Sequence, residues 1–210
     1  MAYAAASDII EFGQFNSDDA VNSTLTTYLG VLCASAQAII DAHCHRSFGS
    51  AAASDMVAAT RTFDAYADVD DMTLWLDEDL YGTASDITIT NGDATTVASS
   101  DYVFEPRNTQ PKFGIKLKAS SGLAWQWPTN GDPEDAISIL GYWTYAMTTP
   151  ADIKQATMRL AHHLYKQRET DSTLDRPLLT PSGHTIMPGK LPNDVITLLG
   201  PYVKARVGDG

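Results

Sequence analysis

The first half of the chain contains almost no basic residues. Residues 1–105 carry 17 Asp and Glu but only two basic residues, Arg46 and Arg61, which gives this half a net charge of −15. Residues 106–210 carry nine acidic and twelve basic residues, a net charge of +3. Binding nucleic acid requires a dense basic surface, so residues 1–105 are not expected to bind nucleic acid.

Cysteine is also scarce. Cys33 and Cys44 are the only two in the 210 residues, and both fall in a stretch with helical periodicity. Eleven residues of helix separate two side chains by about 16 Å along the axis, whereas a disulfide needs Cα atoms within roughly 7 Å. We therefore expect two packed, reduced thiols in a protein made in a cytosol.

Long apolar runs are missing as well. No stretch of 18 uncharged apolar residues occurs, and the first residues lack the basic segment of a secretory signal. The sequence therefore predicts neither a membrane span nor a signal peptide. With 44% apolar and 19% charged residues, the composition is typical of one large globular domain, or one domain with an appendage.

Hydrophobic periodicity changes twice along the chain. Apolar residues spaced three and four apart predict a long helix over 19–46, and a second helix begins near Pro150 and runs to about Glu169. Between them the period is two, and Asn91-Gly92 is a strong hairpin signal. The predicted strands lie near residues 61–64, 72–76, 86–90, 95–97, 102–104, 113–118 and 137–145. The fold class is therefore α+β, with two helices packed as a helical bundle and an inserted antiparallel sheet or small barrel.

The C-terminal region differs from the rest. Four prolines in 170–192 predict an extended tether, and an amphipathic segment follows from Asn193. We accordingly divide the chain into an N-terminal extension (1–18), a main domain (19–169) and a tether with a short helix (170–210). The final segment either docks into a partner's groove or folds back on the chain's own helices. The residues expected on its docking face are Leu198, Leu199, Tyr202, Val203, Lys204 and Arg206.

Recognisable catalytic motifs are missing, including the phosphate-binding loop and the His-Glu-x-x-His zinc motif. One acidic cluster follows the first predicted strand: Asp68, Asp70, Asp71, Asp77, Glu78 and Asp79. As a calcium loop it fails, because Thr73 stands where glycine is required. We interpret the cluster as solvated turns, and we expect no metal and no cofactor. His162 and His163 lie off the apolar stripe of the second helix, which indicates surface or interface positions.

The order of several short motifs carries a resemblance. Ile40-Asp41 is followed by Arg46-Ser47-Phe48, then by a sheet region, then by Gly141-Tyr142-Trp143-Thr144-Tyr145, and finally by Pro150-Ala151-Asp152-Ile153-Lys154-Gln155-Ala156. This order resembles the head–tail connector (adaptor) proteins of tailed bacteriophages, over about residues 25–206. Thr144 departs from the pattern, since the family often has glycine there.

The resemblance implies a non-enzymatic structural protein of the virion neck. In this family, copies of the chain, about twelve to match the portal, form a closed ring beneath it. One side would contact the portal and the other a tail or stopper protein, while DNA passes through without specific binding. The protein would be made in the bacterial host cytoplasm and would contact no membrane. Under this interpretation, the acidic cluster is a candidate for a channel-facing surface that repels the duplex.

Two alternatives stay open at this stage. A tail-completion or other virion accessory protein would share the fold and differ in its partner. A metal-dependent hydrolase would use the acidic cluster of residues 68–79 to hold a divalent ion.

Overall fold

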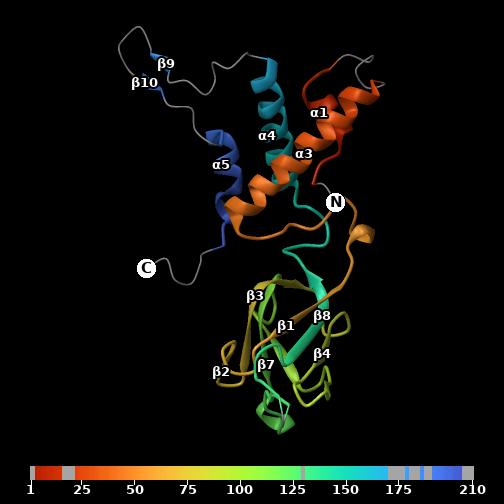
Figure 1. The fold of residues 1–210 in the computed structure, drawn as a ribbon, viewed down its shortest axis with the longest axis vertical. Coiled ribbons are helices and arrows are strands. Elements are labelled where there is room, and N and C mark those ends of the chain that lie inside the picture. The colour runs from red at the N-terminus through yellow and green to blue at the C-terminus, as the bar shows by residue number, and fades with distance from the viewer. Residues whose placement is uncertain are drawn as a thin grey trace. The chain divides into compact units, whose positions relative to one another are not determined.

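In the computed structural model the chain folds as two units (Figure 1). The α-unit consists of Met1–His45 and Thr149–Gly210, and the β-unit consists of Arg46–Thr148. The sheet is therefore inserted between two helical segments, as the sequence predicts. The structure describes residues 3–15, 22–128, 131–169, 178–179, 185–186 and 191–204.

Four helices form the described part of the α-unit. Their bounds are Ala6–Phe12 (α1), Ser23–Cys44 (α3), Ala151–Glu169 (α4) and Asn193–Leu199 (α5), with a 3-10 turn at Gly200–Tyr202. α3 contacts α1 and α4, and α4 also contacts α1 and α5. The apolar side chains buried between them are Tyr3, Ala4, Ile9, Leu29, Leu32, Cys33, Ala36, Ile40, Cys44, Ile153, Ala156, Leu160, Ala161, Val195 and Leu199. α1 lies within the expected N-terminal extension and has no counterpart among the predicted helices.

The two long helices are found with slightly different bounds from those predicted. α3 begins at Ser23 because the side-chain oxygen of Asn22 accepts hydrogen bonds from the backbone N–H groups of Thr24 (3.1 Å) and Leu25 (3.2 Å). Such an N-cap satisfies donors that a helix start otherwise leaves unpaired. The helix ends at Cys44, since His45 adopts a left-handed conformation with φ of 54°.

Neither cysteine forms a disulfide, and both are buried in the α-unit. Burial raises the pKa of Cys33 to about 11, and the nearby Asp8 carboxylate acts in the same direction. A thiol with so high a pKa carries almost no thiolate near neutral pH.

Part of the predicted tether is described. β9 (Leu178–Leu179) and β10 (Thr185–Ile186) pair with each other in an antiparallel ladder. Residues 191 and 192 lead directly into α5. The other residues of the 170–192 segment lie outside the described part of the chain.

The β-unit is an antiparallel, nearly closed, barrel-like sheet. Its strands are Ala59–Phe63 (β1), Val69–Asp70 (β2), Thr73–Tyr81 (β3), Thr88–Thr90 (β4), Thr96–Val97 (β5), Tyr102–Glu105 (β6), Lys112–Leu117 (β7) and Ile137–Trp143 (β8). The main path through the sheet is β5-β4-β8-β3-β7-β6, with β1 paired to β8 and β2 paired to β3. Seven of these strands overlap segments predicted from the sequence, and β2 was not anticipated.

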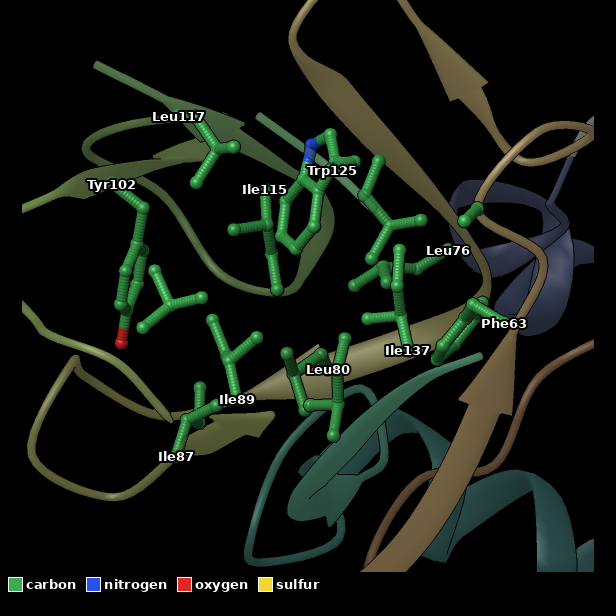
Figure 2. Close-up of a cluster of buried hydrophobic side chains, with 14 of the residues drawn as sticks. Phe63, Leu76, Leu80, Ile87, Ile89, Tyr102, Ile115, Leu117, Trp125 and Ile137 are labelled. Atoms are coloured by element: carbon green, nitrogen blue, oxygen red, sulfur yellow. The ribbon is translucent and has the colours of Figure 1, made fainter. Parts of the chain in front are cut away.

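Alternate side chains of the strands fill the inside of this sheet. On β8, Ile137, Ile139 and Trp143 are buried, whereas Leu140 is exposed. Figure 2 shows Ile137 in the same apolar cluster as Leu80, Ile89 and Ile115 of other strands. Burying a large aliphatic side chain contributes roughly 1.5–3 kcal/mol, so this cluster supplies the main stabilisation of the β-unit. The indole N–H groups of Trp125 and Trp143 are also satisfied, because they donate to the carbonyls of Met72 (3.0 Å) and Ala59 (2.9 Å).

The predicted hairpin at Asn91-Gly92 is confirmed, in a longer form. β4 and β5 pair with Thr90 opposite Thr96, so the turn contains five residues. Asn91 is buried, and its side chain donates to the carbonyl of Ala124 (2.9 Å) and accepts from the N–H of Gln126 (3.0 Å). A Cβ at Gly92 would lie 2.1 Å from the carbonyl oxygen of Gln126. The turn is therefore fixed against the segment around residues 124–126.

Replacing Asn91 with alanine should destabilise the β-unit. The change removes both hydrogen bonds that the buried Asn91 side chain makes to Ala124 and Gln126, and we expect a loss of about 2 kcal/mol in the free energy of unfolding. Urea unfolding followed by tryptophan fluorescence reports this unit, since all four tryptophans lie within it. Asp93→Ala, which removes exposed hydrogen bonds to Thr95 in the same turn, is the matched control. Equal losses for the two variants would contradict the assigned role of Asn91.

Candidate functional site

The expected docking segment forms α5 and the 3-10 turn that follows it. Val195 and Leu199 are fully buried and pack on the chain's own helices, as in the fold-back alternative. Ile196 and Val203 point outward and are 41% and 43% exposed. A partner that approached this surface would reach Val203 directly, and Leu199 only after α5 had moved.

The remaining predicted docking residues lie around this turn. Leu198 and Tyr202 are partly buried, and the Tyr202 hydroxyl donates to the carboxylate of Asp152 on α4 (3.2 Å). The backbone N–H of Lys204 donates to the carbonyl of Cys44 at the end of α3 (2.9 Å). Arg206 lies outside the described residues. Whether this surface meets a portal stays a prediction.

An ion pair also holds α5 on α4. The Arg159 guanidinium lies 2.6 Å from the carboxylate of Asp194 in the first turn of α5. The hydrogen bond from Arg159 holds the pKa of Asp194 below its usual range. Both side chains are substantially exposed, so solvent screens the pair and its contribution to stability is small.

The acidic cluster of residues 68–79 is spread over several distinct environments. Asp79 is buried, with Arg46 Nε 3.4 Å from its carboxylate, and Glu78 pairs with Arg61 at 2.7 Å. Asp71 lies 3.6 Å from Lys116 Nζ.

The three other members of the cluster do not join these pairs. The Asp68 carboxylate accepts from the N–H of Asp64, and Asp70 and Asp77 are exposed. In the described ranges no three His, Cys, Asp or Glu side chains are placed to hold a metal ion. The described residues therefore provide no ion site for the alternative of a metal-dependent hydrolase.

The motif residues at the start and end of the β-unit lie close together. The Arg46 guanidinium lies over the ring of Tyr145 (5.2 Å to the centroid), and the buried ring of Phe48 also contacts Tyr145 (5.6 Å). The hydroxyl of Thr144 donates to the carbonyl of Ala146 (3.0 Å), and the N–H of Tyr145 donates to the carbonyl of Ser47 (2.8 Å). These motif residues thus have a structural role, which is to join the two chain segments that enter and leave the β-unit.

The motif residues on the helices are structural as well. Asp41 of α3 accepts a hydrogen bond from the buried Tyr3, and burial raises the pKa of Asp41. Lys154 of α4 lies 2.9 Å from the carboxylate of Asp8 on α1. Both contacts attach the N-terminal segment to the long helices.

α3 presents a long exposed face without charge. Asp41 is the one charged residue among its 22 residues, and Val31 is 56% exposed. The exposed positions recur at spacings of three and four: Thr24, Thr27, Val31, Ala34, Ser35, Ala38, Ile39 and Ala42. Water-facing sides of helices ordinarily carry charged residues. This uncharged face of α3 is therefore a candidate contact surface.

By length and composition alone, α3 could also cross a membrane, and it is the one described helix for which this holds. The expectation that the chain has no membrane span stays a prediction, because this match rests on the length and composition of α3 alone. Helices that lie in a protein core pass the same test, and 22% of the most apolar window of α3 is buried here.

A second exposed apolar surface lies on the β-unit. The rings of Trp75 on β3 and Phe113 on β7 are both exposed and stack, with centroids 6.2 Å apart and planes inclined by 12°. Gly114 makes room for the indole, since a Cβ there would lie 3.1 Å from the Trp75 ring. In the sequence, Trp75 lies between Leu74 and Leu76, which both point inward. Because successive side chains of a strand point to opposite faces, this position indicates that Trp75 points outward.

Comparison with known proteins finds similarity at the level of solved structures. Neither a family model nor a curated protein matches the sequence. A chain from the neck of an empty gene transfer agent (GTA) particle, computed with C6 symmetry, aligns with a TM-score of 0.53 and 16% identity, covering 98% of this chain and 91% of that one. A chain from the virion of a native GTA particle aligns with a TM-score of 0.54, 18% identity and the same two coverages. The protein therefore shares a nearly full-length fold with components of gene transfer agent particles.

Proposed function

We propose that this protein is a structural component of a virion neck, a head–tail connector that forms a ring beneath the portal, joins the head to the tail and lets DNA pass. The observation that carries the proposal is the nearly full-length match to a chain of a particle neck. The order of the sequence motifs that resemble connector proteins gives separate support. Of these motif residues, Arg46 and Phe48 both contact the ring of Tyr145 in this fold. The carboxylates of the acidic cluster lie in several separate environments, and a structural role does not require them to share one site.

Ring assembly is supported by the uncharged face of α3. A face of small, uncharged side chains lets a neighbouring backbone approach closely and pairs with a similar face without requiring opposite charges. The similar neck structure was computed with C6 symmetry, so that particle neck repeats around an axis. We infer that α3 packs with α4 in a helical bundle within each copy and exposes this face to the next copy.

Introducing a charge on this face should weaken assembly. Val31→Asp places a carboxylate where an adjacent copy would exclude water, and an unpaired buried charge is strongly unfavourable. We expect at least about tenfold weaker self-association, measured by native mass spectrometry and negative-stain microscopy of the purified protein. Val57→Asp, the same change at a site that is 74% exposed in the β-unit, should assemble normally. Rings of unchanged stability in Val31→Asp would contradict the assignment.

The portal contact is assigned to the surface around the end of α5. Val203 is exposed there, while the buried Val195 and Leu199 keep α5 in place. We propose the exposed rings of Trp75 and Phe113 as the contact for the second partner, a tail or stopper protein, because they form an exposed apolar patch.

Changing Val203 should reduce capture of the protein by portal-bearing heads. Val203→Asp adds a charge to the exposed surface without touching the buried side chains of α5, and we expect about a tenfold loss of capture in a pull-down or cosedimentation assay. Val203→Leu conserves the apolar contact and should be captured normally. Capture of the aspartate variant at the wild-type level would show that the portal binds elsewhere.

The acidic β-unit is assigned to the DNA channel. It contains 15 acidic and six basic residues, and Asp70 and Asp77 are exposed on it. A negative channel wall repels the duplex and keeps it from adhering during passage. A neck reconstruction in which residues 68–79 lie wholly on the outside of the ring would exclude this assignment. Failure of portal-bearing heads to capture the protein would instead favour a tail-completion or accessory position.

A further inference from the structure

The turn between β4 and β5 contains a dipeptide that can react with itself. In Asn91-Gly92 the backbone nitrogen of Gly92 follows the side-chain amide of Asn91, and glycine has no Cβ to block the approach to that amide. The sequence Thr-Asn-Gly-Asp occurs twice in the chain, at residues 90–93 and at residues 129–132. Local sequence therefore gives Asn91 and Asn130 the same intrinsic reactivity.

The reaction is deamidation through a cyclic imide. The Gly92 nitrogen gives its proton to the solvent and bonds to Cγ of Asn91. The bond from Cγ to Nδ2 breaks, and Nδ2 takes up a proton and leaves as ammonia. Water then adds to one carbonyl carbon of the imide and breaks the bond from that carbon to nitrogen, which yields aspartate or isoaspartate. Water is the co-reactant, and the reaction needs no oxidant, reductant or cofactor.

The fold holds the side-chain amide of Asn91 in place. The side chain is buried, its Nδ2 donates to the carbonyl of Ala124 (2.9 Å), and its Oδ1 accepts from the N–H of Gln126 (3.0 Å). The backbone is fixed as well, since the N–H of Asn91 donates to the carbonyl of Thr95 (2.8 Å). Loss of ammonia therefore requires the hydrogen bond to Ala124 to break inside a buried site.

The nitrogen that would attack is also restrained. The N–H of Gly92 donates to Oδ1 of Asn91 (3.0 Å) in a buried position, so its proton points at that oxygen and is shielded from the solvent. A Cβ at Gly92 would lie 2.1 Å from the carbonyl oxygen of Gln126, so the 124–126 segment packs tightly on this residue. Closure of the imide ring requires Asn91 to rotate, and the packed segment prevents this rotation.

We propose that Asn91 is a latent deamidation site, which the folded β-unit protects and which becomes reactive when the 124–126 segment leaves the turn. The conversion is irreversible for the fold. An aspartate at this position cannot donate to the carbonyl of Ala124, and its carboxylate would face that oxygen in a buried site, which is unfavourable. Isoaspartate adds a methylene group to the backbone of the turn and disturbs the pairing of β4 with β5. Each β-unit that has opened long enough to react is therefore permanently marked.

The test compares the two Asn-Gly sites in the full-length protein. Peptide mapping by mass spectrometry follows the conversion of Asn91 and Asn130 at mildly alkaline pH, in buffer and in a urea concentration that unfolds the β-unit. In urea the two sites should react at similar rates, because their local sequences match. In buffer Asn91 should react at least about tenfold more slowly than in urea, since only the small open population can react. Equal rates for Asn91 in buffer and in urea would overturn the proposal.

Two tryptophan variants test the role of the 124–126 segment. Trp125 is buried, and its indole N–H donates to the carbonyl of Met72 (3.0 Å), so Trp125→Ala should loosen the segment. Trp127 lies two residues further along and is 48% exposed. Asn91 should react about tenfold faster in Trp125→Ala than in the wild type, because the open state is more populated, whereas Trp127→Ala should keep the wild-type rate. Equal rates in the two variants would contradict the protection by this segment.

The irreversible step is tested with the product itself. Asn91→Asp should lower the urea midpoint of the β-unit, followed by tryptophan fluorescence. Asn108→Asp makes the same change at an exposed position of the same unit and should keep the wild-type midpoint. A wild-type midpoint for Asn91→Asp would show that the turn closes again after conversion, which would overturn the irreversible step.

Discussion

The β-unit depends on the hydrogen-bonded pairing of one strand, β8. Residues 137–141 pair with β1, residues 138–140 pair with β4, and the last two residues of the strand pair with β3. These partners all precede β8 in the chain, so β8 connects β1, β3 and β4 within one sheet. Its inward side chains then complete the apolar interior, and every residue of that interior belongs to the β-unit.

The regular elements could be predicted where a pattern repeats several times. The alternation along residues 113–118 and 137–145 was long enough to identify β7 and β8, and spacings of three and four identified α3 and α4. β2 could not be predicted, because two residues contain no period. α1 is seven residues long, and its first residues lack a strong sequence cap, so its helical state depends on the burial of Tyr3 and Ile9 against other helices.

The candidate surfaces were harder to predict than the elements. Periodicity shows that one side of the 193–199 segment is apolar, but it does not show that the chain's own α4 covers Leu199. The same limit applies to the acidic cluster, whose partners Arg46, Arg61 and Lys116 lie on other segments of the chain. The sequence places His162 and His163 off the apolar stripe, but it does not show that Phe12 contacts His162, because tertiary packing brings α1 to α4.

The burial of both cysteines has a practical consequence for locating this protein in a particle. With Cys33 and Cys44 enclosed in the α-unit, and the Cys33 thiol protonated near neutral pH, the native chain offers no fast-reacting sulfur. A single cysteine placed at an exposed site such as residue 57 or 203 would then accept a maleimide dye or a gold label without removal of the natural thiols. Distances between labelled copies could be measured in this way in an otherwise unmodified protein.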